Sequence, residues 1–322
     1  MPNTFDWSQF DIAAQSGLAG VTSIWGPAPL SDAQMDRYTR LVYERTGIRI
    51  SPQKKMLLAN RLRRRIRETG LPDFEAYYRY LSNLPSGHPE WDAFYQEITT
   101  HETYLFRDEN QWRWFRQVFL KEVQAAVTSK RRPRELDIWS AACSTGDEPV
   151  TIACCIAAVI PTWESWTIRI LGTDIGLGAL EEAKAGIYDA RAMRLVPEDY
   201  RRRFFIPLPD GRWKVKPALL SRITYRQHNL LHPLPSGAFD LVFLKNVLIY
   251  FDAHSKRRAL ENLVARIKPG GYLVTGPAEG VGDVGPQMVR QCAWLFRKTP
   301  GPTTAEAVSA RSSQPTPVVG VK

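Results

Sequence analysis

The chain has 322 residues, of which 44% are hydrophobic, and a formal net charge of +10. This length predicts about two domains with a sizeable core. No signal peptide opens the chain, and its longest apolar run, Pro149 to Ile160, is too short to span a bilayer, so a soluble, cytoplasmic protein without membrane insertion is expected. The four cysteines lack C-x-x-C spacing, which argues against a metal site or a disulfide framework and favours thiols used as small core residues. The positive charge indicates an acidic partner.

The first hundred residues predict a leader and a helical domain. Residues 1–30 are irregular and contain "WGPAPL", whereas residues 31–100 show helical spacing. One helix is expected to begin at Ser31 and end at Gly47, and a second to begin at Ser51 and end at Gly70. Two further stretches, "DFEAYYRYLSNL" and "PEWDAFYQEITT", complete a small bundle.

Residues 101–298 alternate between strand and helix patterns, which is typical of a mostly parallel sheet. The remaining residues, 299–322, are rich in Pro, Thr, Ser and Ala and predict a disordered tail.

A turn of small residues, "SAACSTG" (140–146), separates the first strand of this region from an apolar helix. Such a turn lets backbone N–H groups approach a cofactor at the carboxyl ends of the strands. The absence of G-x-G-x-x-G disfavours a dinucleotide. The next strand, "TIRILGTD", ends on Asp174, whose carboxylate could accept hydrogen bonds from both hydroxyls of a ribose. A structural turn followed by a surface Asp remains the alternative.

Later segments carry a resemblance to a known family. In "ARIKPGGYLVTG" a Pro-Gly-Gly turn is expected between a helix and another strand. This turn and the strand in "FDLVFLKNVLIYF" resemble the second half of a class I S-adenosylmethionine-dependent methyltransferase sheet. Together with "ITTHETYLFRD", "IWSAACSTGDEPVTIA" and "HNLLHPLPSGAFDLVFLKNVLIYFD", they resemble the CheR family of chemotaxis receptor glutamate methyltransferases over about residues 31–296. The fold implied is α/β, a Rossmann-like sheet with an N-terminal all-α domain and a small β-hairpin insertion at about 204–216.

The resemblance implies S-adenosylmethionine as cofactor, with S-adenosylhomocysteine as product. The cofactor-binding residues that it implies are His101, Thr103, Arg107, Glu148, Asp174, Asn229, Leu230, Asn246 and Val247. Asp174 would bind the ribose, Asn229 the adenine edge, and Asn246 the methionine part. Three residues depart from the family's usual pattern, since His101 replaces Asn, Asp147 replaces Glu, and Lys245 replaces Arg.

Arg107 and Tyr250 are the catalytic candidates, expected to orient the acceptor carboxylate. A glutamate is ionised near neutral pH, so alignment and partial desolvation are required but no general base is. The alternatives are a surface salt bridge for Arg107 and a core aromatic residue for Tyr250.

A basic helix is the candidate docking surface. Arg61, Arg64 and Arg65 in "RLRRRIR" are expected to lie away from the Leu58/Leu62 stripe and to contact acidic receptor helices. Nucleic acid is a rival partner for this helix but is not expected. The short turn "PLPDGR" in the insertion favours a mode of docking that needs no receptor tether, and a monomer is expected. Two other functions remain open, a non-catalytic S-adenosylmethionine-sensing docking module and a methyltransferase acting on RNA.

Overall fold

The computed structural model describes residues 28–99, 102–282 and 284–300. Predictions for His101, for most of the leader and for most of the tail therefore lie outside the described residues. Within them, no helix is long and apolar enough to cross a membrane.

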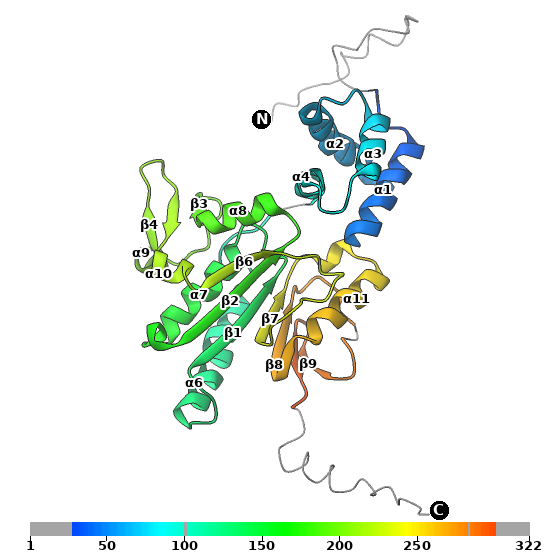
Figure 1. Cartoon of the computed structure of the whole chain (residues 1–322). Coiled ribbons are helices and arrows are strands. Elements are labelled where there is room, and N and C mark those ends of the chain that lie inside the picture. Colours follow the sequence, from blue (N-terminus) through cyan, green and yellow to red (C-terminus); the bar gives the residue numbers. More distant parts are fainter. Residues whose placement is uncertain (1–27, 100–101, 283, 301–322) are drawn as a thin grey trace, which may run out of the picture.

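The N-terminal part of the described chain is a four-helix bundle (Figure 1). Its helices are α1 (Asp32–Thr46), α2 (Lys55–Thr69), α3 (Phe74–Asn83) and α4 (Pro89–Ile98). Ser31 caps α1 and Gly47 ends it in a left-handed conformation (φ 73°), as the sequence predicted. A 3₁₀ turn, Pro52–Lys54, precedes α2, so the second helix begins four residues later than expected.

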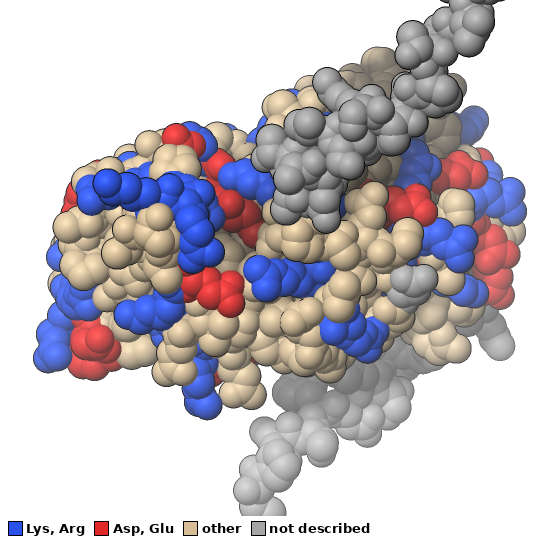
Figure 2. Space-filling view, turned by 90° about the horizontal axis from the view of Figure 1, so that it is seen from below, with Lys and Arg blue, Asp and Glu red and all other residues tan. Residues whose placement is uncertain are grey.

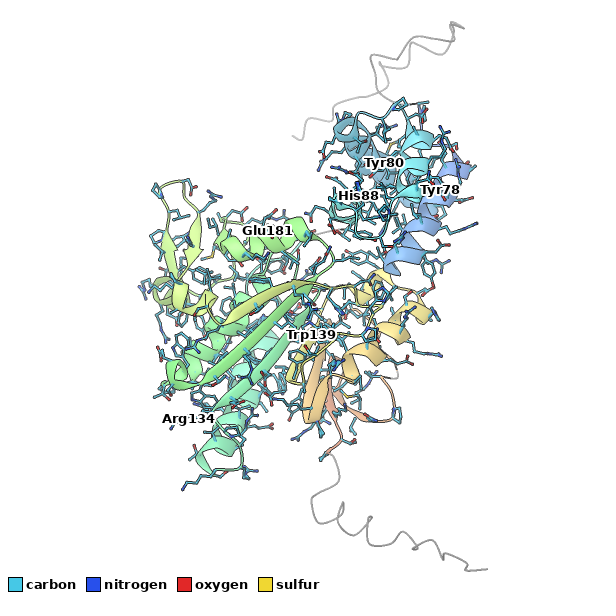
Figure 3. The ribbon with its side chains drawn as sticks, in the orientation of Figure 1. Tyr78, Tyr80, His88, Arg134, Trp139 and Glu181 are labelled. Atoms are coloured by element: carbon cyan, nitrogen blue, oxygen red, sulfur yellow. The ribbon has the colours of Figure 1, made fainter. Side chains whose placement is uncertain are left out.

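The bundle core is rich in aromatic residues. Tyr38 and Tyr77 are fully buried, and the hydroxyl of Tyr38 donates to the carbonyl of Phe74. At the edge of the bundle the rings of Tyr80 and His88 meet edge to face at 6.1 Å (Figure 3). These contacts bury the apolar faces that the helical spacing indicated.

A seven-stranded sheet forms the second part of the chain, in the order β6-β2-β1-β7-β8-β10-β9. The strands β6, β2, β1, β7 and β8 run parallel to one another, whereas β10 is antiparallel to both β8 and β9. The order reverses between β1 and β7, which is where open α/β sheets bind ligands. The strand bounds are β1 (Glu135–Ala141), β2 (Thr167–Asp174), β6 (Ile223–Gln227), β7 (Phe239–Leu244), β8 (Ile267–Thr275), β9 (Met288–Cys292) and β10 (Leu295–Lys298).

Helices cover both faces of this sheet (Figure 1). Leu136 and Ile138 of β1 pack into one apolar cluster, whereas Trp139 and Ala141 pack into another on the opposite face. Trp139 lies at the centre of the sheet (Figure 3) and its indole N–H donates to the hydroxyl of Thr173. The helices of this part are α5 (Glu109–Trp114), α6 (Leu120–Thr128), α7 (Asp147–Val159), α8 (Leu177–Ala185), α9 (Glu198–Phe204), α10 (Pro217–Leu220) and α11 (Ala253–Val264).

The predicted β insertion is present and larger than expected. Strands β4 (Phe205–Pro207) and β5 (Trp213–Val215) form the hairpin, and β3 (Ile187–Tyr188) adds a third strand on the other side of β5. Strand β3 has only two residues, which is too short for an alternation of apolar and polar residues to be recognised in the sequence.

Two smaller expectations are wrong. The Pro-Gly-Gly segment does not lie between helix and strand but inside β8, where the pairing with β7 shifts register and Gly270 has a φ of 77°. Cys292 is exposed, whereas the other three thiols are buried in the core as predicted.

The basic residues are scattered over the face of the molecule seen from below. On this face Lys and Arg lie at both ends and in the middle, with Asp and Glu among them (Figure 2). On this side of the molecule the excess positive charge therefore forms no continuous surface.

Candidate active site

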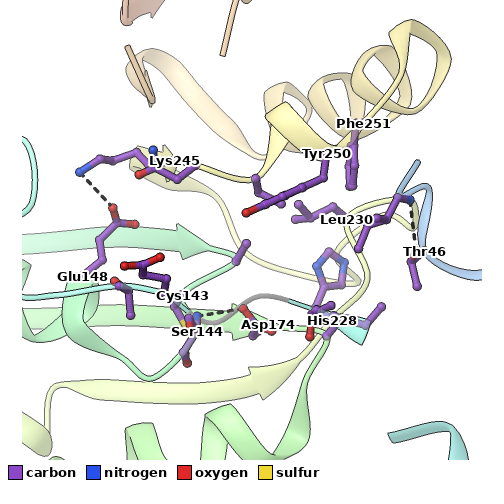
Figure 4. A pocket seen from close by; sticks show the side chains of 18 of the residues that line it. Thr46, Cys143, Ser144, Glu148, Asp174, His228, Leu230, Lys245, Tyr250 and Phe251 are labelled. Atoms are coloured by element: carbon purple, nitrogen blue, oxygen red, sulfur yellow. Dashed lines mark hydrogen bonds and ion pairs between the residues drawn. The ribbon is translucent and has the colours of Figure 1, made fainter. Parts of the chain in front are cut away.

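A cavity opens at the carboxyl ends of β1, β2 and β7, beneath the helical bundle (Figure 4). Its walls come from the turn after each strand, from the segment that joins the bundle to α5, and from the end of α1. Among the lining residues are the predicted Thr103, Arg107, Glu148, Asp174, Asn229, Leu230, Asn246, Val247 and Tyr250. The structure thus brings together all the predicted cofactor and catalytic residues that it describes.

The turn after β1 is shaped by unusual backbone angles. Ala142 and Ser144 have φ values of 61° and 49°, and Gly146 has a φ of 82°. A Cβ atom on Gly146 would lie 2.7 Å from the hydroxyl of Tyr225, so only glycine fits without displacing a neighbour. The turn leaves room for a ligand above small side chains.

Asp174 ends β2, and the residue is 6% exposed. The backbone N–H of Ser144 donates to Oδ2 at 2.8 Å, and that of Gly176 donates to Oδ1 at 2.9 Å. A carboxylate can accept about four hydrogen bonds, so two backbone donors leave capacity for a ligand's hydroxyl groups.

A buried charge cluster adjoins the cavity, which Lys245 and Glu148 help to line. The Lys245 ammonium lies 3.3 Å from the carboxylate of Asp108 and 3.6 Å from that of Glu148, and it donates to the carbonyl of Arg107. Burial raises the pKa of Glu148, whereas Lys245 and the hydroxyl of Ser140 act in the opposite direction. The usual Arg of the family is thus replaced by a Lys that still serves as a cation here.

Arg107 and Tyr250 line the cavity from two different segments of the chain. One N–H of Arg107 donates to the carbonyl of Glu102, which leaves other donors of the guanidinium for a ligand. Tyr250 ends a 3₁₀ turn, Leu248–Tyr250, and its ring points into the cavity (Figure 4). Its carbonyl accepts a hydrogen bond from the N–H of Arg49 in the bundle.

Asn229 and Asn246 differ in how they are held. The Asn229 side chain donates to the carbonyl of Arg45 and accepts from the N–H of Leu231, so it fastens the bundle to the sheet domain. One amide N–H of Asn229 remains for an adenine edge. Asn246 has a φ of 61°, a conformation that an asparagine tolerates better than most residues.

The prediction that Arg65 lies away from the apolar stripe of helix α2 is wrong. Arg65 does not face outward, because its side chain is only 11% exposed and pairs with Glu90 at 2.7 Å. The physical reason is spacing, since Arg65 follows Leu62 by three residues and therefore shares its face of the helix. Arg61 is half-buried by the same rule and donates to the carbonyl of Ile98. Arg64 is exposed as predicted and pairs with Glu97.

Several lining residues escaped the sequence analysis. The bundle contributes Thr46 and Ile48, and the segments after the strands contribute Ser144, Ile175 and His228. Ile175 could have been found, because it directly follows the recognised Asp174. Thr46 and Ile48 carried no local signal, since they reach the cavity only through the packing of the bundle on the sheet.

Comparison with known proteins agrees with this geometry. Residues 33–99 match the family model described as CheR methyltransferase, all-alpha domain, and residues 101–293 match the CheR methyltransferase, SAM binding domain. The chain is 37% identical over 251 residues to the chemotaxis protein methyltransferase 1 of Pseudomonas aeruginosa, covering 76% of this chain and 89% of the relative. It is 35% identical over 258 residues to the chemotaxis protein methyltransferase of Escherichia coli, covering 78% and 85%. The matches confirm the predicted class I methyltransferase fold with an N-terminal all-α domain.

Proposed function

We propose that this chain, which belongs to the CheR methyltransferase family, forms methyl esters on glutamate side chains of chemoreceptor helices. Membership of the family makes the chain a methyltransferase that uses S-adenosylmethionine. The names of the relatives in Escherichia coli and Pseudomonas aeruginosa support a protein of a chemotaxis-type pathway as the substrate.

The cavity fits this cofactor in its polar and apolar parts. Asp174 offers a carboxylate that is already fixed by two backbone donors, as ribose hydroxyls require. Glu148 offers an acidic group for an amino group, and Leu230 and Val247 offer apolar walls. The small-residue turn after β1 contributes Ala142, Cys143 and Ser144 to the lining, so a ligand can approach its backbone there. Bound S-adenosylmethionine supplies an electrophilic methyl group on a positively charged sulfur.

The acceptor needs positioning more than activation. A glutamate has an unperturbed pKa of about 4.3, so it arrives as a nucleophilic carboxylate. Arg107 and Tyr250 both line the cavity, and each can donate a hydrogen bond to such a carboxylate. One hydrogen bond from each would orient the carboxylate and leave it reactive. We assign the orienting role to this pair.

Two hydrogen bonds join the helical bundle to the segment around Tyr250, beside the cavity. The N–H of Arg49 donates to the carbonyl of Tyr250 at 2.8 Å, and the hydroxyl of Tyr43 donates to Asp252 just beyond it. The bundle is therefore held against the segment that carries Tyr250.

The exposed side of α2 is the proposed docking surface for an acidic helix. Lys54 lies 5.7 Å from the ring centroid of Tyr250, so this end of the helix adjoins the catalytic turn. Met56 and Leu57 are exposed beside it, and Arg64 adds a positive charge about two turns further on. Apolar contacts flanked by cations suit an amphipathic helix that carries rows of glutamates.

The experiment is a transfer assay with methyl-labelled S-adenosylmethionine and two acceptors, receptor-containing membranes and total RNA. A sample without any acceptor serves as the blank. Label that appears on the receptor and is released by base supports the proposal, because glutamyl methyl esters hydrolyse in base. The Asp174→Ala variant serves as a control with weakened cofactor binding. Label on RNA would favour the RNA methyltransferase, and cofactor binding without any transfer would favour the sensing module.

A further inference from the structure

Glu279 is a buried carboxylate that belongs to no predicted site. It lies after β8 in "TGPAEG" and is 1% exposed. It does not line the cavity, yet it lies directly behind the turn that carries Tyr250.

Its two oxygens accept three backbone hydrogen bonds. Oε1 accepts from the N–H of Val247 at 2.8 Å and from that of Leu248 at 3.1 Å, and Oε2 accepts from the N–H of Gly276 at 3.0 Å. The carboxylate therefore bridges the segment after β7 to the segment after β8.

The segment after β7 needs such support. Asn246 is held in the left-handed region, and the 3₁₀ turn that follows leaves its first N–H groups without partners inside the turn. Glu279 supplies these partners from outside. Asn246 and Tyr250, at the two ends of the segment, both line the cavity.

The packing around Glu279 is close. A Cβ atom on Gly276 would lie 3.1 Å from the backbone nitrogen of Asn246 and 3.1 Å from the Glu279 carboxyl carbon. Burial raises the pKa of Glu279, while the three N–H groups lower it. A carboxylate is rarely buried this deeply unless its hydrogen bonds fix something, and here they fix the turn.

We propose that Glu279 is a positioning residue that holds the Asn246–Tyr250 segment in its cofactor-binding and catalytic geometry. It touches neither ligand and acts through the backbone of Val247 and Leu248. The effect on turnover rests on the proposed function, whereas the effects on cofactor affinity and on the turn do not.

Three proteins are compared: the wild type, Glu279→Ala and Glu279→Gln. The glutamine can still accept from Val247 and Leu248, but its amide group then faces the N–H donor of Gly276. We expect Glu279→Ala to weaken S-adenosylhomocysteine binding by about tenfold or more in calorimetry, with the glutamine variant between it and the wild type. Amide hydrogen exchange at Val247 and Leu248 should accelerate by about tenfold or more in Glu279→Ala.

Asp240→Asn is the matched control. Asp240 is also a buried carboxylate that accepts a backbone hydrogen bond, from Asp137, but it lies at the opposite end of β7. The Asp240 substitution and the Glu279 substitutions should all lower the melting temperature. Only the Glu279 variants should change exchange at Val247 and Leu248 and cofactor affinity.

A double-mutant cycle with Tyr250→Phe measures the coupling between the two residues in turnover. General destabilisation of the fold would not change this coupling. If Glu279 acts through the turn, Tyr250→Phe should reduce turnover much less in the Glu279→Ala protein than in the wild type. Additive effects, or unchanged exchange and cofactor affinity in Glu279→Ala, would overturn the proposal. A wild type that binds the cofactor without methylating receptors would instead count against the proposed function alone, because binding and exchange would still decide the role of Glu279.

Discussion

The carboxylate of Asp174 is fixed by two backbone N–H groups before any ligand binds. Replacing it with alanine should remove the acceptor for the ribose hydroxyls and cost about 1.5 to 3 kcal/mol of binding free energy. Calorimetry should show S-adenosylhomocysteine bound roughly ten- to a hundredfold more weakly. Unchanged affinity would mean that Asp174 only supports the Ser144 turn.

Tyr250 tests the catalytic assignment. Tyr250→Phe keeps the ring but removes the hydroxyl that points into the cavity (Figure 4). Because the hydroxyl is assigned to the acceptor carboxylate, the substitution should lower kcat with little change in cofactor affinity. Steady-state kinetics at saturating cofactor measures this. Normal turnover would return Tyr250 to the role of an aromatic wall.

Asp147 gives the protein a pH-dependent stability. Burial raises its pKa to about 6, although the hydroxyl of Thr145 donates to it. In the unfolded chain an aspartate titrates near about 3.9, so folding takes up a proton between these two pH values. The free energy of unfolding should therefore fall as the pH rises from about 4 to about 6.

Asp147→Asn should remove this contribution. The variant and the wild type should be compared by urea unfolding across about pH 4 to 7, because Glu148 and Glu279 also have raised pKa values and contribute in the same direction. The difference between the two proteins isolates Asp147. A constant difference across this range would contradict the assignment.

At the scale of elements, helix α2 carries one arginine that is buried, Arg65, and one that is exposed, Arg64. Arg65 belongs to the fold, because its pair with Glu90 is buried and the hydroxyl of Tyr77 donates to the same carboxylate. Arg65→Met should leave Glu90 buried without its cation and cost about 3 to 5 kcal/mol of stability.

Arg64 is part of the proposed docking surface. It is 62% exposed, and its pair with Glu97 should be worth less than about 1 kcal/mol. Arg64→Glu should therefore keep the melting temperature and cofactor affinity while raising the KM for the receptor, most strongly at low salt. A receptor KM that is unchanged at every salt concentration would exclude α2 as the docking surface.

Elements with a regular pattern could be predicted from the sequence. The capping residue Ser31 and the terminal Gly47 define α1, and the small-residue turn before α7 was predicted from its composition. Strand β3 was missed because two residues show no alternation, and the Pro-Gly-Gly turn was misplaced because a bulge lets the strand continue through it.

At the scale of the molecule, lining residues that lie next to a recognisable strand could be predicted from the sequence. Lining residues that reach the cavity only because the bundle packs on the sheet could not. Asp174 and Asn246 follow strands whose carboxyl ends must meet at one edge of the sheet. The contributions of Thr46 and Ile48 depend on how the bundle sits on the sheet. This placement is fixed by contacts between distant segments, such as that of Arg49 with Tyr250, for which no local pattern exists.

The identity of the methylated group is the central claim, and peptide mass spectrometry tests it most directly. A purified receptor cytoplasmic fragment is incubated with the wild-type protein and S-adenosylmethionine, digested, and sequenced by fragmentation. The account predicts single methyl additions on glutamate side chains of the receptor helices, lost after mild base treatment and greatly reduced with Tyr250→Phe. Methylation that is confined to lysine, arginine or the chain ends would contradict the account. So would a receptor that stays unmodified although the protein binds the cofactor normally.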